Sequence, residues 1–301
     1  MARMMTPAIE RVQKKSKNAT TGVGTPLHEA WKRLRRNRPA MIGLGIIAFM
    51  LLIGLFAPLI APYGYREQNI SLMLATPSLE HPFGCDHLGR DILSRCIYGA
   101  RYSLPIGIIC VIIGLVIGGG IGIIAAYFGG KVDYFLMRFI DILQAIPNIL
   151  LCIALVAILG NGVVQLVIAI AAGSIQGMAK TCRTAVFMVR NNEFIDSSKS
   201  IGESDIKIMM RHVIPNAVGL IVINAVAGVS GNILTISSLS YIGVGLVSPT
   251  PEWGAILSEG KTYLSVAPHC VYMPGLMIAI TVLAFNLFGN GLRDALDPRL
   301  K

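Results

Sequence analysis

Residues 193–216 read EFIDSSKSIGESDIKIMMRHVIPN, and they form a polar segment between two long apolar runs. Phe194, Ile195 and Ile201 fit one apolar face of a short helix. Gly202 suits the left-handed C-cap of that helix, because glycine adopts a positive φ without steric cost. The first half of the segment therefore predicts a short helix that ends in a tight turn.

A second short helix is expected after the turn. Ser204 or Asp205 can cap its N-terminus, and Pro215 should end it. Its apolar residues repeat every three to four positions, as in an amphipathic helix; they are Ile206, Met209, Met210 and Val213. A plain loop between spans needs only a few residues. The helical pair therefore indicates a docking surface for a partner protein or, as the alternative, a lid over the protein's own cavity.

Outside this segment the composition is that of a membrane protein. Of the 301 residues, 54% are hydrophobic and only 14% are charged, whereas soluble domains contain about 25% charged residues. A helix needs about 20 apolar residues to cross a bilayer. We therefore predict an all-α integral membrane protein with six transmembrane helices, at about 41–61, 103–128, 134–158, 163–179, 217–247 and 271–291.

The net charge of +10 reflects membrane topology rather than nucleic-acid binding. About ten of the 26 Lys and Arg residues precede Met41, and about six lie between Lys180 and Arg211. Alternation through six spans places both groups on the side of the C-terminus, and the opposite side carries about five. The positive-inside rule predicts that both termini and the segment 193–216 are cytoplasmic.

The N-terminal tail, residues 1–40, contains the basic stretch TPLHEAWKRLRRNRP at 25–39. Thr25 is a plausible N-cap, Pro26 suits the first helical position, and apolar residues follow at helical spacing. We expect an interfacial helix on the inner leaflet, with an unstructured basic tail as the alternative. Residues 1–24 are expected to be disordered. No cleavable signal peptide is expected, because the first apolar run has full spanning length.

An external segment at 62–102 follows the first span. His81, Cys85 and His87 are of the types that bind zinc or nickel, but their spacing matches no recognised site. We favour a packed loop that leads into a helix from about Arg90. Free thiols are expected, and a disulfide between two of the three external cysteines is the alternative; these are Cys85, Cys96 and Cys270.

Several residues place polar groups or a broken backbone at membrane depth, where they are costly unless they face a cavity or another helix. The candidates for lining a pathway are Pro147, Asn148, Asn224, Asn232 and Asn286. Apart from Asp141 near one end, no acid or base lies well inside a predicted span, which disfavours an ion-coupled carrier.

Three glycines in the second span, Gly114, Gly118 and Gly122, share one helix face. Such a face lets helices approach closely, which fits a bundle built against a partner. The alternative is the ordinary tolerance of membrane helices for glycine.

The segment 193–216 resembles the cytoplasmic loop of permease subunits in binding-protein-dependent ABC importers. The family pattern has Glu-Ala-Ala, then Gly, and later Ile-x-Leu-Pro or a variant. Here Asp196-Ser197-Ser198, Gly202 and Val213-Ile214-Pro215 stand at those places. Serine is a poorer helix former than alanine by about 0.5 kcal/mol per residue, so the first helix is expected to depend more on docking.

Other stretches resemble the C-type permease of dipeptide, oligopeptide and nickel importers, so that the resemblance covers residues 27–301. Cys85 stands where Thr is usual, and Asn290 stands where Asp is common. The stretches are FGCDHLGRDILSRCIYGARYSL at 83–104, LSYIGVG at 239–245, PTPEWGAILSEG at 249–260 and LAFNLFGNGLRDALDPRLK at 283–301.

The resemblance implies the type I ABC importer permease fold in a bacterial cytoplasmic membrane. It divides the chain into the tail at 1–40, the first transmembrane helix and external segment at 41–100, the permease domain at 101–291 and a cytoplasmic C-terminal tail at 292–301. The implied partners are a second homologous permease subunit, two cytoplasmic ABC ATPase subunits and an extracytoplasmic solute-binding protein.

In such a complex the ATPases bind ATP and Mg²⁺ and hydrolyse the nucleotide. This chain has no phosphate-binding loop motif, so it is not expected to bind ATP or to be an enzyme by itself. No cofactor or metal is expected in this chain. The element that couples it to an ATPase would comprise Phe194, Ile195, Asp196, Ser197, Ser198, Lys199, Gly202, Glu203 and Pro215.

The resemblance favours short peptides as cargo. Nickel, a metal–chelator complex and glutathione-like molecules are the alternatives within the family. An ion-coupled secondary transporter and a membrane enzyme are distant alternatives from other classes.

Overall fold

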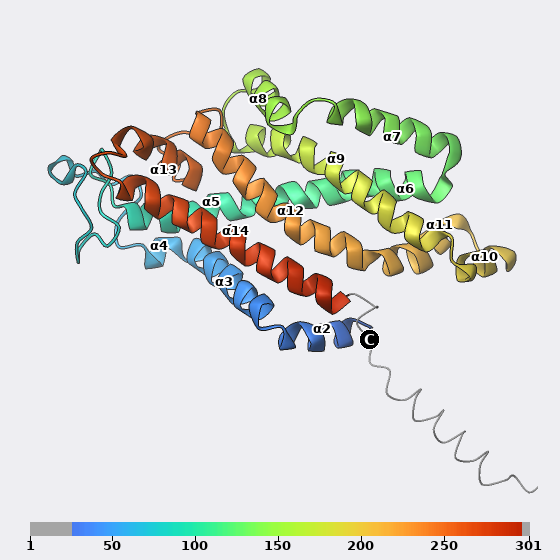
Figure 1. Ribbon diagram of the computed structural model, residues 1–301. Helices are drawn as coiled ribbons and strands as arrows, with labels where there is room; N and C mark the ends of the chain where they lie inside the picture. The colour runs from blue at the N-terminus through green and yellow to red at the C-terminus, as the bar shows by residue number, and fades with distance from the viewer. Residues whose placement is uncertain (1–25, 297–301) are drawn as a thin grey trace, which may run out of the picture.

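The computed structural model describes residues 26–296, and within them the chain is an elongated bundle of helices joined by loops (Figure 1). An isolated β-bridge joins Cys85 to Asp91. The expectations for Thr25, for residues 1–24 and for the last five residues concern positions outside this range. The predicted all-α fold is confirmed.

Five helices in residues 26–296 are long and apolar enough to cross a membrane. They are α3 (Arg38–Leu55), the continuous helix formed by α5 (Ile92–Ile113), η2 (Gly114–Gly119) and α6 (Gly120–Phe128), α9 (Val163–Arg190), the continuous helix formed by α11 (Asp205–Ile208), η3 (Met209–Val213) and α12 (Ile214–Ile242), and α14 (His269–Leu296). The shorter elements are α2 (Pro26–Arg36), α4 (Ala57–Ile60), η1 (Ile70–Leu72), α7 (Gly130–Gln144), α8 (Asn148–Leu159), α10 (Glu193–Ser200), α13 (Trp253–Gly260) and η4 (Lys261–Tyr263).

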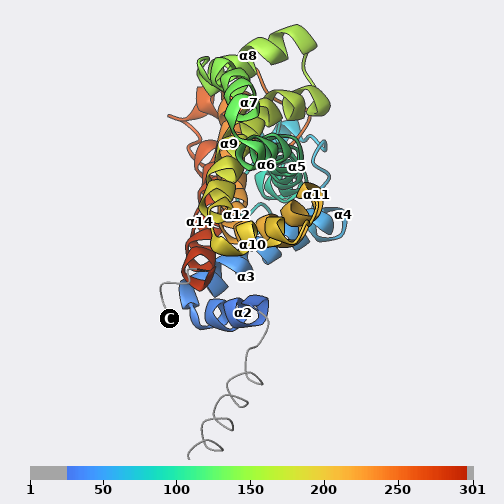
Figure 2. The ribbon, with the colours of Figure 1, turned by 90° about the vertical axis from the view of Figure 1, so that its right-hand side faces the viewer.

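A sixth candidate span consists of α7 and α8, which meet at an angle of 80°. Pro147 causes the break, because proline lacks an N–H and disfavours helical backbone in the residue before it. Its own ψ of 130° is outside the helical range. The third predicted span, at 134–158, is therefore broken near its middle, as Pro147 and Asn148 indicated. Figure 2 shows α7 and α8 on one side of the bundle and α2 and α3 on the opposite side.

The helix after Gly202 does not end at Pro215, so that expectation is wrong. The helix passes through the π-helical turn Met209–Val213 and continues to Ile242. A π-turn pairs residues five apart rather than four. This wider turn ends at Val213, two residues before Pro215, and the helix continues through the proline without a break.

The glycine face predicted in the second span packs against α9. A Cβ at Gly114 would lie 2.8 Å from Ser174 Cβ, and a Cβ at Gly118 or Gly122 would overlap the backbone carbonyls of Ile175 or Ala179. The close approach of helices is thus confirmed, and it occurs within the chain. These contacts bring α9 against η2 and α6.

The basic helix α2 packs against the end of α14. Leu34 is buried in a cluster with Ala40 and Ala295, and Asn37 caps α3 by accepting a hydrogen bond from Ala40 N at 3.2 Å. Trp31, on the same helix, is exposed. The N-terminal helix is therefore held to the bundle by the helix at the opposite end of the chain.

Candidate coupling element and translocation path

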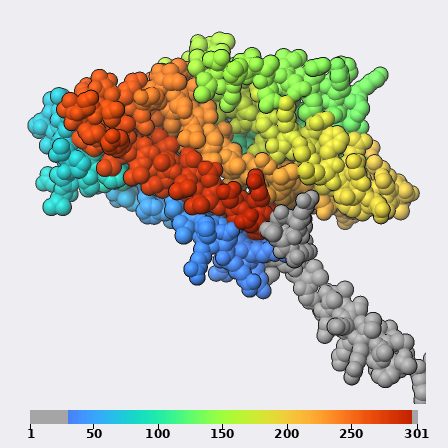
Figure 3. Space-filling model, in the orientation of Figure 1, coloured from blue at the N-terminus to red at the C-terminus, as the bar shows by residue number. Residues whose placement is uncertain are grey.

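Helices α10 and α11 protrude beyond the bundle at the end where α6 and α9 terminate (Figures 1 and 3). The loops at 61–91 and helix α13 lie at the other end (Figure 1). The predicted helix, turn and helix are therefore confirmed as a unit. We call α10, its turn and α11 with η3, residues 193–213, the coupling element.

Three apolar side chains fasten the coupling element to the bundle. Ile195, Ile208 and Val213 are fully buried, and they pack in one cluster with residues of α6 and α9. That cluster includes Tyr127, Ala185 and Val189. Burial of a large aliphatic side chain contributes about 1.5–3 kcal/mol, so these anchors hold the element at a fixed place on the bundle.

The apolar faces predicted for the two short helices are partly wrong. Phe194 and Ile201 are exposed, whereas Ile195 is buried. Ile206 and Met210 are also exposed, and the buried anchor of the second helix is Ile208. Spacing alone could not distinguish the face that meets α6 and α9 from the face that remains outside.

The turn between the helices has the backbone that the glycine predicted. Gly202 has a φ of +80°, its N–H donates to Lys199 O at 2.9 Å, and Glu203 N donates to Ser198 O at 3.2 Å. Residues other than glycine rarely adopt this left-handed conformation. Gly202 thus reverses the chain direction and keeps α10 beside α11.

The serines of Asp196-Ser197-Ser198 each donate to a backbone carbonyl one turn earlier. Ser197 Oγ donates to Glu193 O at 2.9 Å, and Ser198 Oγ donates to Phe194 O at 3.0 Å. Hydroxyl groups in helices commonly satisfy themselves in this way. The buried Ser198 side chain therefore leaves no hydroxyl unpaired where the family pattern has alanine.

Polar contacts fix the start of the second helix. Tyr127 Oη at the end of α6 donates to Asp205 Oδ1 at 2.7 Å. Glu203 contacts Lys207 Nζ at 3.1 Å and His212 Nε2 at 3.0 Å. The Lys207 hydrogen bond, followed by that of His212, holds the pKa of Glu203 below its ordinary value of 4.5 despite desolvation.

The outer face of the coupling element is apolar at four positions. Phe194, Ile201, Ile206 and Met210 are between 41% and 82% exposed. Lys199 and Asp196 lie among them and are also exposed. Exposed apolar groups rimmed by polar residues are typical of protein interaction surfaces.

A cavity of about 290 Å³ lies between α5, α8, α9 and α12. It brings together three of the predicted path residues, namely Asn148, Asn224 and Asn232. The remaining lining is small or uncharged and consists of Val111, Gly173, Ser174, Gly177, Met178, Thr181, Gly228, Gly231 and Thr235. The cavity therefore offers amide and hydroxyl groups but no ionised side chain.

Two predicted path residues lie elsewhere. Asn286 on α14 accepts a hydrogen bond from Ser230 Oγ at 3.2 Å and does not line this cavity. Pro147 precedes α8 and forms the bend instead. Asn232 also has a structural role, because its side chain accepts a hydrogen bond from Ser174 Oγ at 3.1 Å and donates one to Gly107 O at 3.2 Å.

The predicted path residues were asparagines and one proline, so the hydroxyl groups that line the cavity were not predicted. Ser174 and Thr181 are seven residues apart on α9, and Thr235 is eleven residues after Asn224 on α12. These separations place each set on one helix face. The signal was present in the sequence but is weak, because membrane helices use Ser and Thr at many positions.

Ion pairs between α7 and α9 were also missed. Arg183 donates two hydrogen bonds of 2.6 Å to the carboxylate of Asp133, and Lys180 Nζ lies 2.8 Å from Asp141 Oδ1. Bidentate pairing of this kind fixes orientation as well as distance. These ion pairs hold α7, the first half of the bent span, against α9, which is one of the helices that line the cavity.

At the opposite end, two buried arginines join the external loop to α13. Arg90 and Arg95 each contact both Asp86 and Glu259, with all four shortest distances at 2.6 Å. The helix predicted from about Arg90 begins at Ile92, with Asp91 as its N-cap. We call Asp86, Arg90, Arg95 and Glu259 the external brace.

The candidate metal ligands of this loop do not converge. His81 Nδ1 bonds Asp91, Cys85 is a buried free thiol, and the His87 ring stacks on Tyr263. Potential ligand atoms of Asp86, His87 and Glu259 do lie within 4.8 Å of one another. Both carboxylates already neutralise the two arginines of the brace, so this arrangement is poorly suited to a further cation.

Comparison with known families decides what this architecture is. Residues 118–301 match the family described as binding-protein-dependent transport system inner membrane component. The chain belongs to this family of ABC importer permeases. Residues 25–77 of the permease also match the N-terminal transmembrane domain of oligopeptide transport permease C, so it is a C-type permease, as the sequence motifs indicated.

The permease has close relatives among known proteins. It is 44% identical over 280 residues to the glutathione transport system permease protein GsiD of Escherichia coli O6:K15:H31 (strain 536 / UPEC), covering 93% of this chain and 92% of that protein. The GsiD proteins of Shigella boydii serotype 4 and Escherichia coli O157:H7 give the same identity and coverage. The predicted membership and the multi-pass location in a bacterial inner membrane are confirmed.

Solved structures show the same fold at low identity. The inward-facing MetNI methionine ABC transporter matches with a TM-score of 0.58 and 17% identity, over 68% of the permease and 98% of that chain. An amino acid ABC transporter with histidines matches with a TM-score of 0.51 and 18% identity, over 67% and 94% of the chains. Membership of the family implies ATPase and binding-protein partners and a membrane, and it makes this chain a permease component of a transporter.

Proposed function

We propose that the permease forms half of the translocation path of an ATP-driven importer of short peptides, and that a second homologous permease subunit forms the other half. The observation that carries this proposal is the uncharged cavity around Asn148, Asn224 and Asn232. Amide and hydroxyl groups can exchange hydrogen bonds with a peptide backbone. Because the cavity contains no ionised group, it does not hold a zwitterionic cargo by electrostatic attraction.

The cargo is assigned to small peptides, with glutathione-like tripeptides foremost. The 44% identity to a glutathione permease over 93% of the chain supports this assignment. The match of residues 25–77 to an oligopeptide permease domain supports it as well. Selectivity then resides mainly in the solute-binding protein, because the cavity in this subunit offers only uncharged contacts.

The coupling element docks in a cleft of one cytoplasmic ATPase, with both termini on that side of the membrane. Its exposed Phe194, Ile201, Ile206 and Met210 supply the apolar contact, and Asp196, Lys199 and Glu203 lie around them. ATP and Mg²⁺ bind to the ATPases. Closure of the ATPases moves the element as a rigid body and switches the path from outward- to inward-facing.

Cargo is tested by uptake into proteoliposomes that contain the complete importer and its binding protein. Radiolabelled glutathione, a dipeptide, a pentapeptide and nickel are offered separately, with ATP enclosed. Uptake of peptides that is competed by other peptides supports the proposal. Uptake of nickel or a nickel chelate alone would assign the alternative cargo.

Coupling is tested with Lys199→Cys in inside-out vesicles. Lys199 is exposed on α10, so a thiol there should crosslink to an introduced cysteine in the ATPase cleft. Lys261→Cys, at the opposite end of the bundle, is the matched control and should react from outside whole cells. Labelling of position 199 from outside would contradict the proposed topology.

A further inference from the structure

A groove of about 450 Å³ lies between α3 and α5. Its lining is apolar except for one arginine; the residues are Leu51, Gly54, Leu55, Ala100, Arg101 and Pro105. The two helices are in close contact at Gly54, where a Cβ would lie 3.1 Å from backbone atoms of Ala100 and Arg101. Leu55 is 67% exposed and Leu51 is 39% exposed, so the groove opens to the surroundings of the bundle.

The groove lies where the hydrocarbon core of the membrane ends. Helix α3 has 18 residues from Arg38 to Leu55, which span about 27 Å at about 1.5 Å per residue. A hydrocarbon core is about 30 Å thick, so Leu55 lies near its boundary. On α5, Arg101 is the last charged residue before an uncharged run that extends to Phe128. Both helices therefore place Arg101 at the level of the lipid headgroups.

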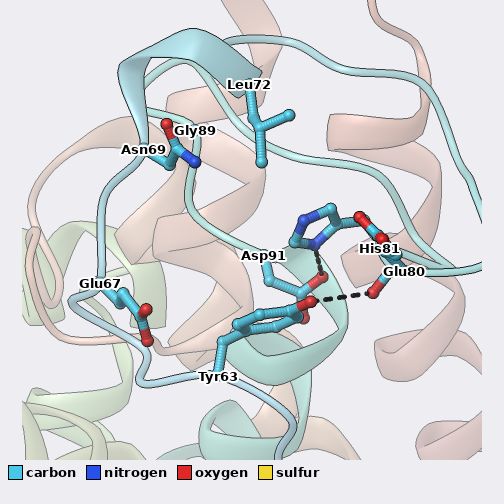
Figure 4. A pocket seen from close by; sticks show the side chains of 8 residues that line it. All are labelled: Tyr63, Glu67, Asn69, Leu72, Glu80, His81, Gly89 and Asp91. Carbon is cyan, nitrogen blue, oxygen red and sulfur yellow. Dashed lines mark hydrogen bonds and ion pairs between the residues drawn. The ribbon is translucent and has the colours of Figure 1, made fainter.

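The charge of Arg101 is not neutralised within the protein. Its side chain is exposed, and its guanidinium makes no hydrogen bond or ion pair with any described residue. The acids of the external loop lie elsewhere, since Glu67, Glu80 and Asp91 line a separate pocket in which Asp91 contacts His81 (Figure 4). An unpaired guanidinium at this depth favours an anionic partner, and phosphate matches its fork of donors.

Pro105 leaves a backbone acceptor beside this guanidinium. In an α-helix the N–H of each residue donates to the carbonyl four residues earlier, and proline has no N–H. The Arg101 carbonyl therefore lacks the partner that position 105 normally supplies. The groove thus combines several donors with an acceptor, which suits a headgroup that carries a phosphate together with a hydroxyl or ammonium group.

The groove faces away from the subunit that would complete the path. The cavity of the path lies between α5, α8, α9 and α12, so a second permease that shares this cavity adjoins those helices. Figure 2 shows α3 on the side of the bundle opposite α7 and α8. The groove on α3 is therefore surrounded by lipid, and every phospholipid carries a phosphate at the boundary of the hydrocarbon core.

We infer that this groove binds one phospholipid of the bilayer, with the phosphate on the Arg101 guanidinium and part of an acyl chain along Leu51 and Leu55. Its volume of about 450 Å³ is within the range of about 300–1,000 Å³ typical of small-molecule sites. The inference goes beyond the proposed function and takes from it only the position of the second subunit. With both termini cytoplasmic, the lipid belongs to the outer leaflet.

The test uses native mass spectrometry of the complete importer in detergent, titrated with phosphatidylglycerol. Arg101→Gln should raise the Kd by about two- to fivefold, as for loss of an exposed ion pair. Diacylglycerol with the same acyl chains lacks the phosphate and should bind both proteins equally. Arg101→Lys should fall between wild type and Arg101→Gln, because lysine keeps the charge but not the fork of donors.

Arg66→Gln is the matched control, because Arg66 is an exposed cation at the same end of the molecule and does not line the groove. This variant should bind phosphatidylglycerol as the wild type does. The lipid should also raise the midpoint of thermal unfolding more for the wild type than for Arg101→Gln. Without added lipid the two midpoints should agree.

Four results would overturn the inference. They are equal affinity of wild type and Arg101→Gln for phosphatidylglycerol, equal weakening by Arg66→Gln, displacement of the lipid by an excess of inorganic phosphate, and a crosslink from Leu55→Cys to the second permease. The third would leave an anion site without a contribution from the acyl chain, and the fourth would show that protein covers the groove. None of them alters the peptide-uptake assay, so the proposed function is tested separately.

Discussion

Gly202 has a φ of +80°, and a Cβ built on it would meet no atom within 4 Å. A side chain at this position therefore creates no clash, and its cost comes from the backbone alone. For a residue other than glycine that cost is about 1–2 kcal/mol, and it is smallest for asparagine. The turn of the coupling element thus depends on one backbone conformation.

We predict that Gly202→Val uncouples ATP hydrolysis from uptake, because a β-branched residue strongly disfavours the left-handed turn. Gly202→Asn should retain most of the transport, since asparagine tolerates this conformation. The measurement is peptide uptake per ATP hydrolysed in proteoliposomes. Equal coupling ratios for valine and wild type, in an intact complex, would contradict a role for the turn in coupling.

Replacement of Ser197 and Ser198 by alanine tests whether their hydroxyl groups matter for transport. Their hydroxyls bond only to carbonyls of the same helix, so Ser197→Ala/Ser198→Ala should strengthen α10 by up to about 1 kcal/mol in total and leave transport unchanged. Slower hydrogen exchange of the α10 amides would report the effect. Ser198→Val is the control, because added volume at a buried position should impair packing. A large loss of transport in the alanine variant would show that the hydroxyls contact the ATPase.

At the scale of elements, the coupling element is held by three apolar anchors and one hydrogen bond to the bundle. The bond from Tyr127 Oη to Asp205 Oδ1 is 2.7 Å long and connects α6 directly to the start of α11. A hydrogen bond to a charged acceptor contributes about 1.5–3 kcal/mol. Its loss should loosen the element without removing the apolar anchors.

Tyr127→Phe should therefore lower the uptake per ATP hydrolysed by roughly tenfold or more, while the complex still assembles. Asp205→Asn is the matched variant, because the amide retains an acceptor oxygen and should lose less. In the double variant the two effects should not add, since both remove the same bond. Fully additive losses would show that each residue acts separately.

The sequence predicted the elements well where a local rule dominates. Uncharged runs marked the spans, Gly202 marked the turn, and Gly114, Gly118 and Gly122 marked the face that meets α9. It could not predict that Ile195 rather than Phe194 is buried, because that choice depends on where α6 and α9 end. Nor could it predict passage through Pro215, since no local sequence rule marks the π-helical turn Met209–Val213 that precedes the proline.

At the scale of the whole molecule, the external brace links residues up to 169 positions apart. Burial alone would raise the pKa of Asp86, but the guanidinium groups of Arg95 and Arg90 outweigh it and hold that pKa below 3.8. The same balance holds the pKa of Glu259 below 4.5. No local sequence pattern connects Glu259 to Arg90 and Arg95, so the brace could not be predicted.

Arg95→Met should destabilise the external end by about 3–5 kcal/mol, because it leaves buried carboxylates with fewer cationic partners. The midpoint of thermal unfolding of the purified complex, followed by size-exclusion chromatography after heating, measures the effect. Arg101→Met removes an exposed charge and should change the midpoint little. Similar midpoints for the two variants would contradict a stabilising brace.

The brace also predicts a dependence on pH. A carboxylate whose pKa is depressed by folding stabilises the fold above its ordinary pKa, and this contribution is lost as the pH falls through the depressed value. The wild-type midpoint should therefore show no loss from these groups between pH 7 and about pH 5, and it should fall below about pH 4. In Arg95→Met the fall should begin at the same pH, which the unfolded-state pKa sets, but it should be smaller, because the pKa values of the carboxylates are less depressed in the folded variant. An identical pH profile for both proteins would exclude the brace as its cause.

The continuous helix from Asp205 to Ile242 carries the buried anchor Ile208 near one end and the cavity residues Asn224 and Asn232 farther along. Because this helix is unbroken at Pro215, a rotation at one end displaces the residues at its other end. At about 1.5 Å per residue, Asn232 lies about 36 Å from Ile208, so a tilt of about 5° around the anchored end displaces it by about 3 Å. An asparagine that now bonds Ser174 and Gly107 would lose both partners over that distance. In the proposed mechanism, a movement applied by an ATPase at one end of this helix would break these hydrogen bonds between helices at the other end.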